Sequence, residues 1–233
     1  MIKNIFLDVG YTLVCPKGYS WWFPVNFFEL CEKETFERVE KTEEYKKRFQ
    51  KGYQYLDDNH LLSDENDEYR VFLEFYKMIL MPFPELRFDV EKLKVAVKSW
   101  VFDYNRAYLY ADVIEILEKW KGEGYKLGII SDNFPSLINS LKHLGIHDFF
   151  DVIVKSCDYG VWKPHEKMYL AAIEPLNAIG EESVFVDDST TALEGAERFG
   201  IKPVLINRDG KTNTAKYPEF KNLKEVDLYI STI

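Results

Sequence analysis

The chain has 233 residues, which is enough for one large domain or for two modest ones. Hydrophobic residues make up 46% and charged residues 30% of it, the balance of a globular protein and not of a disordered one. The net charge of -9 makes nucleic acid and anionic membrane surfaces unexpected partners, and nothing in the composition sets the oligomeric state. An anionic substrate would need a cation or a local positive pocket.

The cysteines and the amino-terminal residues indicate in which cellular compartment the protein is expected. Cys15, Cys31 and Cys157 are scattered, odd in number and without CxxC spacing. This pattern indicates free thiols in a reducing compartment and argues against a disulfide or zinc framework. The first residues reach Asp8 too soon for a signal peptide, and no apolar run approaches the length of a transmembrane helix. We therefore expect a cytoplasmic protein.

Five short apolar runs rich in Ile, Val and Phe predict the strands. Because these runs are continuous and do not alternate with polar residues, they are typical of strands buried on both faces, as in a parallel sheet. The runs are Lys3 to Val9, Tyr125 to Ser131, Phe149 to Ser156, Glu182 to Asp188 and Lys202 to Asn207.

Helical patterns lie between the later runs. Residues 111–124 carry an apolar stripe and end in glycine, residues 135–145 begin with proline and end in glycine, and residues 190–200 close in the same way. Regular alternation of strand and helix predicts βαβ units. The fold class expected is therefore α/β, with a doubly wound, Rossmann-like parallel sheet.

The interval between the first and second predicted strands has a different character. From about Val14 to Tyr108 the sequence holds charged helical patterns and no convincing buried strand. We interpret it as an insertion of three or four helices. The predicted domains are thus an α/β core of residues 1–13 and 109–233, and a helical domain of residues 14–108.

The insertion is rich in aromatic residues. Phe72, Phe75 and Tyr76 have the spacing of a helical stripe, which favours a role in the core of the insertion. Trp21 and Trp22 allow a second interpretation, in which they lie at a hinge and roof a site.

Polar side chains follow the predicted strands. Asp8 ends the first run, Ser131 ends the second, Lys163 follows the third, and the pair Asp187 and Asp188 ends the fourth. In an open α/β sheet, ligands bind outside the carboxyl ends of the strands, so we expect these groups to converge. Carboxylates suit Mg²⁺, and a hydroxyl and a lysine suit phosphate oxygens. One of the two aspartates is also expected to help cap the helix that starts near Ser189.

These four segments, in this order, resemble the haloacid dehalogenase (HAD) superfamily, most of whose members are phosphatases. Asp8 in DVGYT matches the nucleophile motif, Ser131 the hydroxyl motif, and Lys163 in VWKPHEKMY the lysine motif. Asp187 and Asp188 match the acidic metal motif in its paired-aspartate form. The resemblance covers essentially the whole chain, and the helical insertion sits where the family's helical cap lies.

The resemblance implies a catalytic role for Asp8 and a magnesium site beside it. Asp8 would attack the phosphorus of a phosphorylated small molecule and form an aspartyl-phosphate, which water then hydrolyses. Mg²⁺ would be held by Asp8, by the main-chain carbonyl of Gly10 and by Asp188, with Asp187 nearby or acting through water.

The resemblance also implies how the substrate is held. Ser131 and Lys163 would bind the phosphoryl group, and Lys163 would in addition orient Asp8 and the acidic pair, which makes it the second catalytic residue. The substrate-binding segment would include Asp132 and Asn133. Asn133 is expected either to contact the substrate or to support a residue that does, and Asp132 to have mainly a structural role.

Gly10 departs from the family pattern. Family phosphatases carry aspartate there, which protonates the leaving alcohol and then activates water. Glycine keeps the backbone carbonyl for a metal but removes a proton donor that is typically worth about 10²–10⁴ in rate. Tyr11 follows where the family usually has glycine, and its bulk is expected to reshape the turn.

Three functions remain open on the sequence. The first is a Mg²⁺-dependent phosphatase that is weakened or specialised for acyl or aryl phosphates, whose leaving groups need little protonation. The second is an inert phosphate-binding or interaction protein on the same fold. The third is a haloacid dehalogenase, since halide leaves without a proton, although the paired aspartates fit a metal site better. We rank them in this order.

Overall fold

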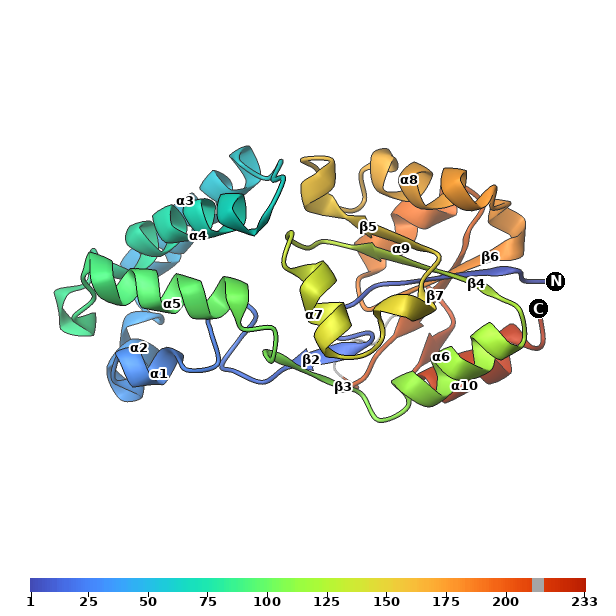
Figure 1. Ribbon diagram of the computed structural model, residues 1–233, viewed down its shortest axis with the longest axis horizontal. Coiled ribbons are helices and arrows are strands. Elements are labelled where there is room, and N and C mark those ends of the chain that lie inside the picture. The colour runs from blue at the N-terminus through green and yellow to red at the C-terminus, as the bar shows by residue number, and fades with distance from the viewer. Residues whose placement is uncertain (211–215) are drawn as a thin grey trace.

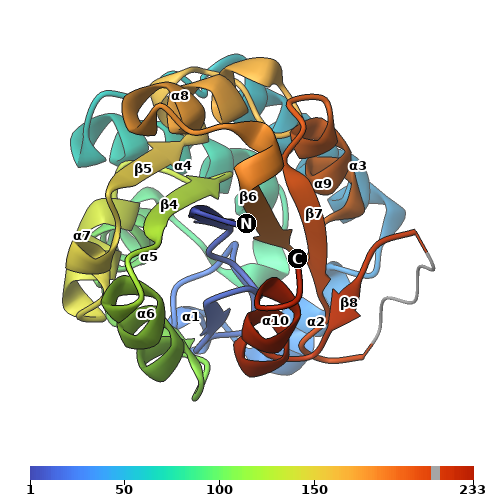
Figure 2. The same cartoon turned by 90° about the vertical axis from the view of Figure 1, so that its right-hand side faces the viewer.

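The computed structural model describes residues 1–210 and 216–233 and contains a six-stranded parallel sheet in the order β5-β4-β1-β6-β7-β8 (Figures 1 and 2). The predicted α/β class with a parallel sheet is confirmed. The edge strand β8 was not predicted, because two residues are too few to carry a hydrophobic pattern. The strands are β1 (Asn4–Leu7), β4 (Lys126–Ser131), β5 (Val152–Lys155), β6 (Ser183–Asp187), β7 (Lys202–Ile206) and β8 (Glu219–Phe220).

Helices cover both faces of this sheet, as Figure 2 shows along the strands. Ile5 and Leu7 pack with α6, α7 and α10 on one face, whereas Phe6 packs with α8 and α9 on the other. Burial on both faces is why the strand sequences are continuously apolar. The helices are α6 (Val113–Gly122), α7 (Leu137–His143), α8 (Glu166–Leu176), α9 (Thr190–Glu197) and α10 (Leu223–Ile230).

Five α-helices lie together beyond one end of the sheet, on the left of Figure 1. The sequence predicted at most four helices here, and the structure has five. The chain is extended at Glu32 between α1 and α2, and the Thr42 side chain starts α3 by accepting a hydrogen bond from the backbone N–H of Tyr45. We call α1–α5 the helical layer. Its helices are α1 (Phe27–Leu30), α2 (Lys33–Val39), α3 (Glu43–Asp58), α4 (Glu65–Leu80) and α5 (Val90–Phe102).

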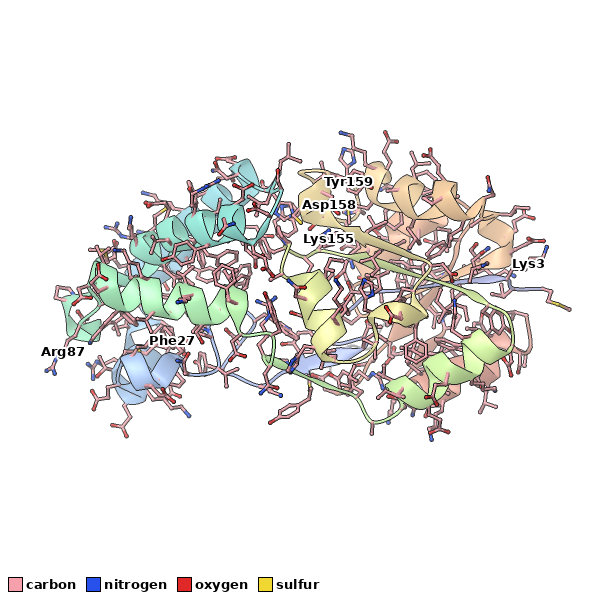
Figure 3. All side chains as sticks on the ribbon, in the orientation of Figure 1. Lys3, Phe27, Arg87, Lys155, Asp158 and Tyr159 are labelled. Atoms are coloured by element: carbon pink, nitrogen blue, oxygen red, sulfur yellow. The ribbon has the colours of Figure 1, made fainter. Side chains whose placement is uncertain are left out.

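The helical layer has its own aromatic core. Phe72, Phe75 and Tyr76 are fully buried, as their helical spacing predicts. Figure 3 shows Arg87 at the outer end of this layer and Lys3 at the opposite end of the molecule. Short 3-10 helices complete the described elements, at Pro84–Leu86, His147–Phe149, Ser156–Asp158 and Gly180–Glu182.

A two-stranded antiparallel ribbon joins the helical layer to the sheet. Its strands, β2 (Val14–Pro16) and β3 (Ala107–Leu109), precede α1 and follow α5. Phe134, which follows β4, and Cys157, which follows β5, are buried in the core of the helical layer. The carboxyl ends of the central strands therefore face the helical layer (Figure 1). Within residues 1–210 and 216–233, no helix has both the length and the apolar character that crossing a bilayer requires.

Candidate active site

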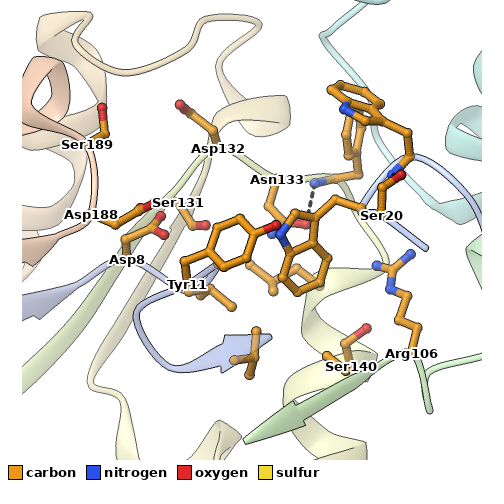
Figure 4. Close-up of a pocket in the computed structure, with 18 of the residues that line it drawn as sticks. Asp8, Tyr11, Ser20, Arg106, Ser131, Asp132, Asn133, Ser140, Asp188 and Ser189 are labelled. Carbon is orange, nitrogen blue, oxygen red and sulfur yellow. Dashed lines mark hydrogen bonds between the residues drawn. The ribbon is translucent and has the colours of Figure 1, made fainter. Parts of the chain in front are cut away.

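The strand register brings the predicted polar residues to one edge of the sheet. Leu7 of β1 pairs with Ile129 of β4 on one side and with Val186 of β6 on the other. Asp8 therefore follows β1 between the ends of these two neighbours, where Ser131 and Asp187 stand. Figure 4 shows Asp8, Ser131 and Asp188 grouped at one side of a pocket.

Lys163 links two of the carboxylates. Its Nζ donates hydrogen bonds of 2.7 Å to Asp8 Oδ1 and of 2.7 Å to Asp187 Oδ2, and its side chain is 5% exposed. Burial opposes the charge of the ammonium group, but the carboxylates of Asp187 and Asp8 outweigh it and hold the pKa of Lys163 well above its usual value. The lysine is thus a fixed positive charge at the centre of the site.

The carboxylates of Asp8, Asp187 and Asp188 offer ligand oxygens that all lie within 4.8 Å of one another. Burial raises the pKa of both Asp187 and Asp188 above the usual value, and the charge of Asp8 acts in the same direction, although Lys163 opposes it. Asp187 is committed to protein partners, since it also accepts a 2.7 Å hydrogen bond from the backbone N–H of Ser189 at the start of α9. The expected contribution to the start of α9 comes from Asp187, while Ser189 itself is the N-cap residue.

Asp132 and Asn133 hold two loops in place next to this cluster. Asp132 Oδ1 accepts a 2.8 Å hydrogen bond from the backbone N–H of Lys163. The backbone N–H and C=O of Asn133 both bond to the Ser156 hydroxyl, at 2.9 and 3.1 Å. The segment after β4 is therefore tied to the segments that follow β5, and the Lys163 backbone is fixed through Asp132.

The turn after β1 contains Gly10 and Tyr11. The backbone of Gly10 is not in the left-handed conformation. A Cβ atom there would meet nothing nearer than Asp8 Oδ2 at 3.9 Å and the Trp21 ring at 4.0 Å. Tyr11, by contrast, has φ 52°, the left-handed conformation that glycine adopts most readily. Tyr11 is 45% exposed, and its ring meets the Trp21 ring edge to face at a centroid distance of 5.7 Å. The space for a side chain at position 10 is present.

A cavity of about 350 Å³ extends from the carboxylates toward the helical layer (Figure 4). Trp21 and Trp22 both line it, and Trp22 also packs against the aromatic core of the helical layer. The sequence did not point to five further lining residues with large or charged side chains, because they are spread over two helices and three loops. They are Tyr53, Trp100, Arg106, Phe134 and Trp162.

Arg106 is one of the lining residues that sequence reasoning missed. It precedes β3, and its Nη1 and Nη2 donate hydrogen bonds to the Trp100 carbonyl at 2.6 Å and to the Ser136 hydroxyl at 2.7 Å. The Ser136 hydroxyl and backbone N–H in turn donate to the buried Glu68 carboxylate, each at 2.7 Å. The nearest signal in the sequence was a lone arginine at the end of a helical pattern, which is not specific.

Comparison with curated proteins identifies a phosphatase and a dehalogenase among the relatives of this chain. Over 121 residues the chain is 36% identical to a glyceraldehyde 3-phosphate phosphatase from Methanopyrus kandleri, a match covering 50% of this chain and 52% of that protein. Over 122 residues it is 33% identical to (S)-2-haloacid dehalogenase 4A from Burkholderia cepacia, with 52% of each covered. The chain spans about half the length of the curated relatives it matches.

Comparison with solved structures covers nearly the whole chain. A HAD phosphatase from Thermococcus onnurineus is 25% identical, with 98% of each chain covered and a TM-score of 0.66. The profile of the family described as haloacid dehalogenase-like hydrolase matches residues 25–206, which is more than half of the sequence. The chain therefore belongs to the haloacid dehalogenase-like hydrolase family.

Proposed function

We propose that this protein is a phosphatase that acts on a small phosphorylated molecule through an aspartyl-phosphate at Asp8, with Mg²⁺ as cofactor. The observation that carries the proposal is the position of Lys163, whose ammonium group lies 2.7 Å from both Asp8 and Asp187. It holds Asp8 at the mouth of the cavity and supplies positive charge where a phosphoryl group would lie. The phosphatase relatives support the same reaction class.

In this proposal Asp8 is the nucleophile. One of its carboxylate oxygens attacks phosphorus, the bond from phosphorus to the leaving oxygen breaks, and water then hydrolyses the aspartyl-phosphate. Ser131, which is buried at the end of β4, and Lys163 bind the phosphoryl oxygens. Asn133 contacts the substrate, and Asp132 keeps the Lys163 backbone in position.

The residues present fit a magnesium ion. Three carboxylates with oxygens within 4.8 Å of one another form the donor set that Mg²⁺ prefers. Asp8, Asp188 and the carbonyl of Gly10 would hold it, since Asp187 is already bonded to Lys163 and Ser189. When bound, the ion offsets the negative charge shared by the carboxylates and the phosphoryl oxygens.

Gly10 makes the nature of the leaving group decisive. Without a carboxyl group at this position, an alkoxide must leave with a proton from elsewhere, whereas a phenolate or a carboxylate leaves readily without one. We therefore expect aryl or acyl phosphates to be turned over faster than alkyl phosphates.

Two alternative functions can be distinguished from the phosphatase by one experiment. An inert phosphate-binding protein would keep the same charges without turnover. A haloacid dehalogenase is favoured by the relative from Burkholderia cepacia and by the missing acid, but the acidic pair next to Asp8 is better suited to a cation.

The test is release of phosphate from alkyl, aryl and acyl phosphates with and without Mg²⁺, together with release of halide from 2-haloacids. Phosphate release that needs Mg²⁺ and is lost in Asp8→Asn would support the proposal. Binding of phosphate without turnover by the wild type would favour the inert protein. Halide release that ignores Mg²⁺ would favour the dehalogenase. Phosphate release indifferent to Mg²⁺ would contradict the proposed mechanism.

A further inference from the structure

The wall of the cavity between the carboxylates and the helical layer is aromatic. Indole or phenyl rings line it from four separate segments, and each of these rings belongs to, or packs against, the buried cores. A ligand body lying here would contact flat apolar surfaces and not water, which favours an aromatic or other apolar body. The rings are those of Trp21, Trp22, Phe23, Trp100, Phe134 and Trp162.

Two cations are found among the described residues that line the cavity, Lys163 and Arg106. Lys163 is bonded to Asp8 and Asp187 at the phosphoryl end. Arg106 lies apart from these carboxylates, and Figure 4 shows Arg106 on one side of the pocket and Asp8 with Asp188 on the other. The cavity thus has one positive group beside the carboxylates, a second away from them, and aromatic rings in its wall (Figure 4).

The guanidinium group of Arg106 has hydrogen-bonding capacity left over. A guanidinium carries five N–H donors, and Arg106 gives one to the Trp100 carbonyl and one to the Ser136 hydroxyl, while its Cζ atom lies 4.7 Å from the centre of the Trp100 ring. Over residues 1–210 and 216–233 it forms no direct ion pair; Ser136 bridges it to the Glu68 carboxylate. Burial lowers the pKa of Arg106, whereas Glu68, Glu65 and Asp103 favour its charged form. A cation in an aromatic cavity, with N–H donors left over and no carboxylate in direct contact, is suited to an anionic ligand group.

We propose that Arg106 binds a carboxylate carried by the substrate, so that the preferred substrates are phosphate esters of aromatic or apolar compounds with a carboxylate remote from the phosphate. The inference rests on the proposed phosphatase function for turnover, and on the cavity alone for binding. For aryl esters it also accounts for Gly10, since a phenolate leaves without a proton donor.

The test compares phenyl phosphate with its 3-carboxy and 4-carboxy derivatives. A charge-assisted hydrogen bond to a carboxylate predicts that kcat/KM for the better carboxylated ester exceeds that for phenyl phosphate by about 10- to 100-fold in the wild type, mainly through KM. In Arg106→Gln the ratio falls to about one. In Arg106→Lys part of the preference for the carboxylated ester remains, because an ammonium group keeps the positive charge but lacks the paired N–H donors of a guanidinium. Arg48→Gln, which removes an exposed ion pair on α3, leaves the ratio unchanged.

Titration calorimetry measures how tightly the three esters bind to Asp8→Asn, which lacks the proposed nucleophile. It therefore tests the Arg106 assignment separately from the proposed phosphatase function, which is tested by turnover in the wild type. Phosphate release from all three esters without preference for a carboxylate would overturn the Arg106 assignment and leave the phosphatase intact. Carboxylate-dependent binding without turnover by the wild type would support the assignment and overturn the phosphatase. If Arg106→Gln fails to fold, the wild-type ratio still decides, since a ratio at or below one overturns the assignment.

Discussion

The imidazole of His60 lies flat against the indole of Trp162, with ring centroids 3.5 Å apart and planes 18° from parallel. His60 comes from the connection between α3 and α4, and Trp162 directly precedes Lys163. His60 Nε2 also lies 2.7 Å from the Ser156 hydroxyl. Because that hydroxyl already donates to the Asn133 carbonyl, Nε2 carries the proton and donates to it. The helical layer is thereby joined to the two loops that flank the site.

Replacing His60 tests this junction. His60→Ala removes the stacked ring and the hydrogen bond, so we expect the free energy of unfolding to fall by about 1–3 kcal/mol and kcat/KM to fall with it. Urea titration and steady-state kinetics measure the two effects. His143→Ala, at an exposed ring 3.4 Å from Asn105, is the control and should change stability by less than about 0.5 kcal/mol. Equal effects of the two substitutions would show that His60 does not join the layers.

Gly10→Asp should restore an acid and base. The backbone there is not left-handed and the nearest atom to a new Cβ is 3.9 Å away, so an aspartate fits. We expect phosphate release from alkyl phosphates to rise by about 10²–10⁴, and that from aryl phosphates to rise much less. Gly10→Asn is the matched control, since it has the same shape without a titratable proton. A rise in Gly10→Asn as large as that in Gly10→Asp would rule out proton transfer as the cause.

Glu68 should make stability depend on pH. Burial raises its pKa from 4.5 to about 7, against the opposing effects of Arg106 and Ser136, with Glu65 acting in the same direction as burial. The folded protein therefore holds this proton more tightly than the unfolded chain, so the stability it contributes is complete below about pH 4.5 and is lost as pH rises through 7. The loss is on the order of 3 kcal/mol.

The substitution Glu68→Gln removes this titration. Between about pH 5 and about pH 8, the free energy of unfolding of the wild type should fall relative to that of Glu68→Gln, as measured by urea titration at each pH. Glu74→Gln, which removes an exposed carboxylate of α4 paired with Lys77, is the control. A constant difference between wild type and Glu68→Gln over this range would mean that Glu68 is not the titrating group.

The groups that follow buried strands could be placed from the sequence. Asp8, Ser131 and Asp187 each end an apolar run, and parallel strands bring their carboxyl ends to one edge. Hydrophobic pattern and chain direction are local properties, so both can be recognised from one sequence. The location of the cluster therefore needed no knowledge of how the helical layer packs.

Contacts between the helical layer and the α/β part could not be placed in this way. Glu68 and His60 meet partners 68 and 96 positions away, and Arg106 meets Ser136 at a separation of 30. Each is a single polar residue in a polar stretch, and its partner is fixed by the packing of two layers. The aromatic wall of the cavity could not be predicted for the same reason, since its rings line the cavity and also pack in the hydrophobic core.

The most direct test of the account is the mass of the protein quenched in acid during turnover of phenyl phosphate with Mg²⁺. Because Gly10 provides no base for hydrolysis, we predict that wild type accumulates one phosphoryl group, located on Asp8 by peptide mapping, and that Asp8→Asn carries none. Gly10→Asp should carry less than wild type while releasing phosphate faster. Phosphate release from a wild type that is never phosphorylated at Asp8 would contradict the mechanism.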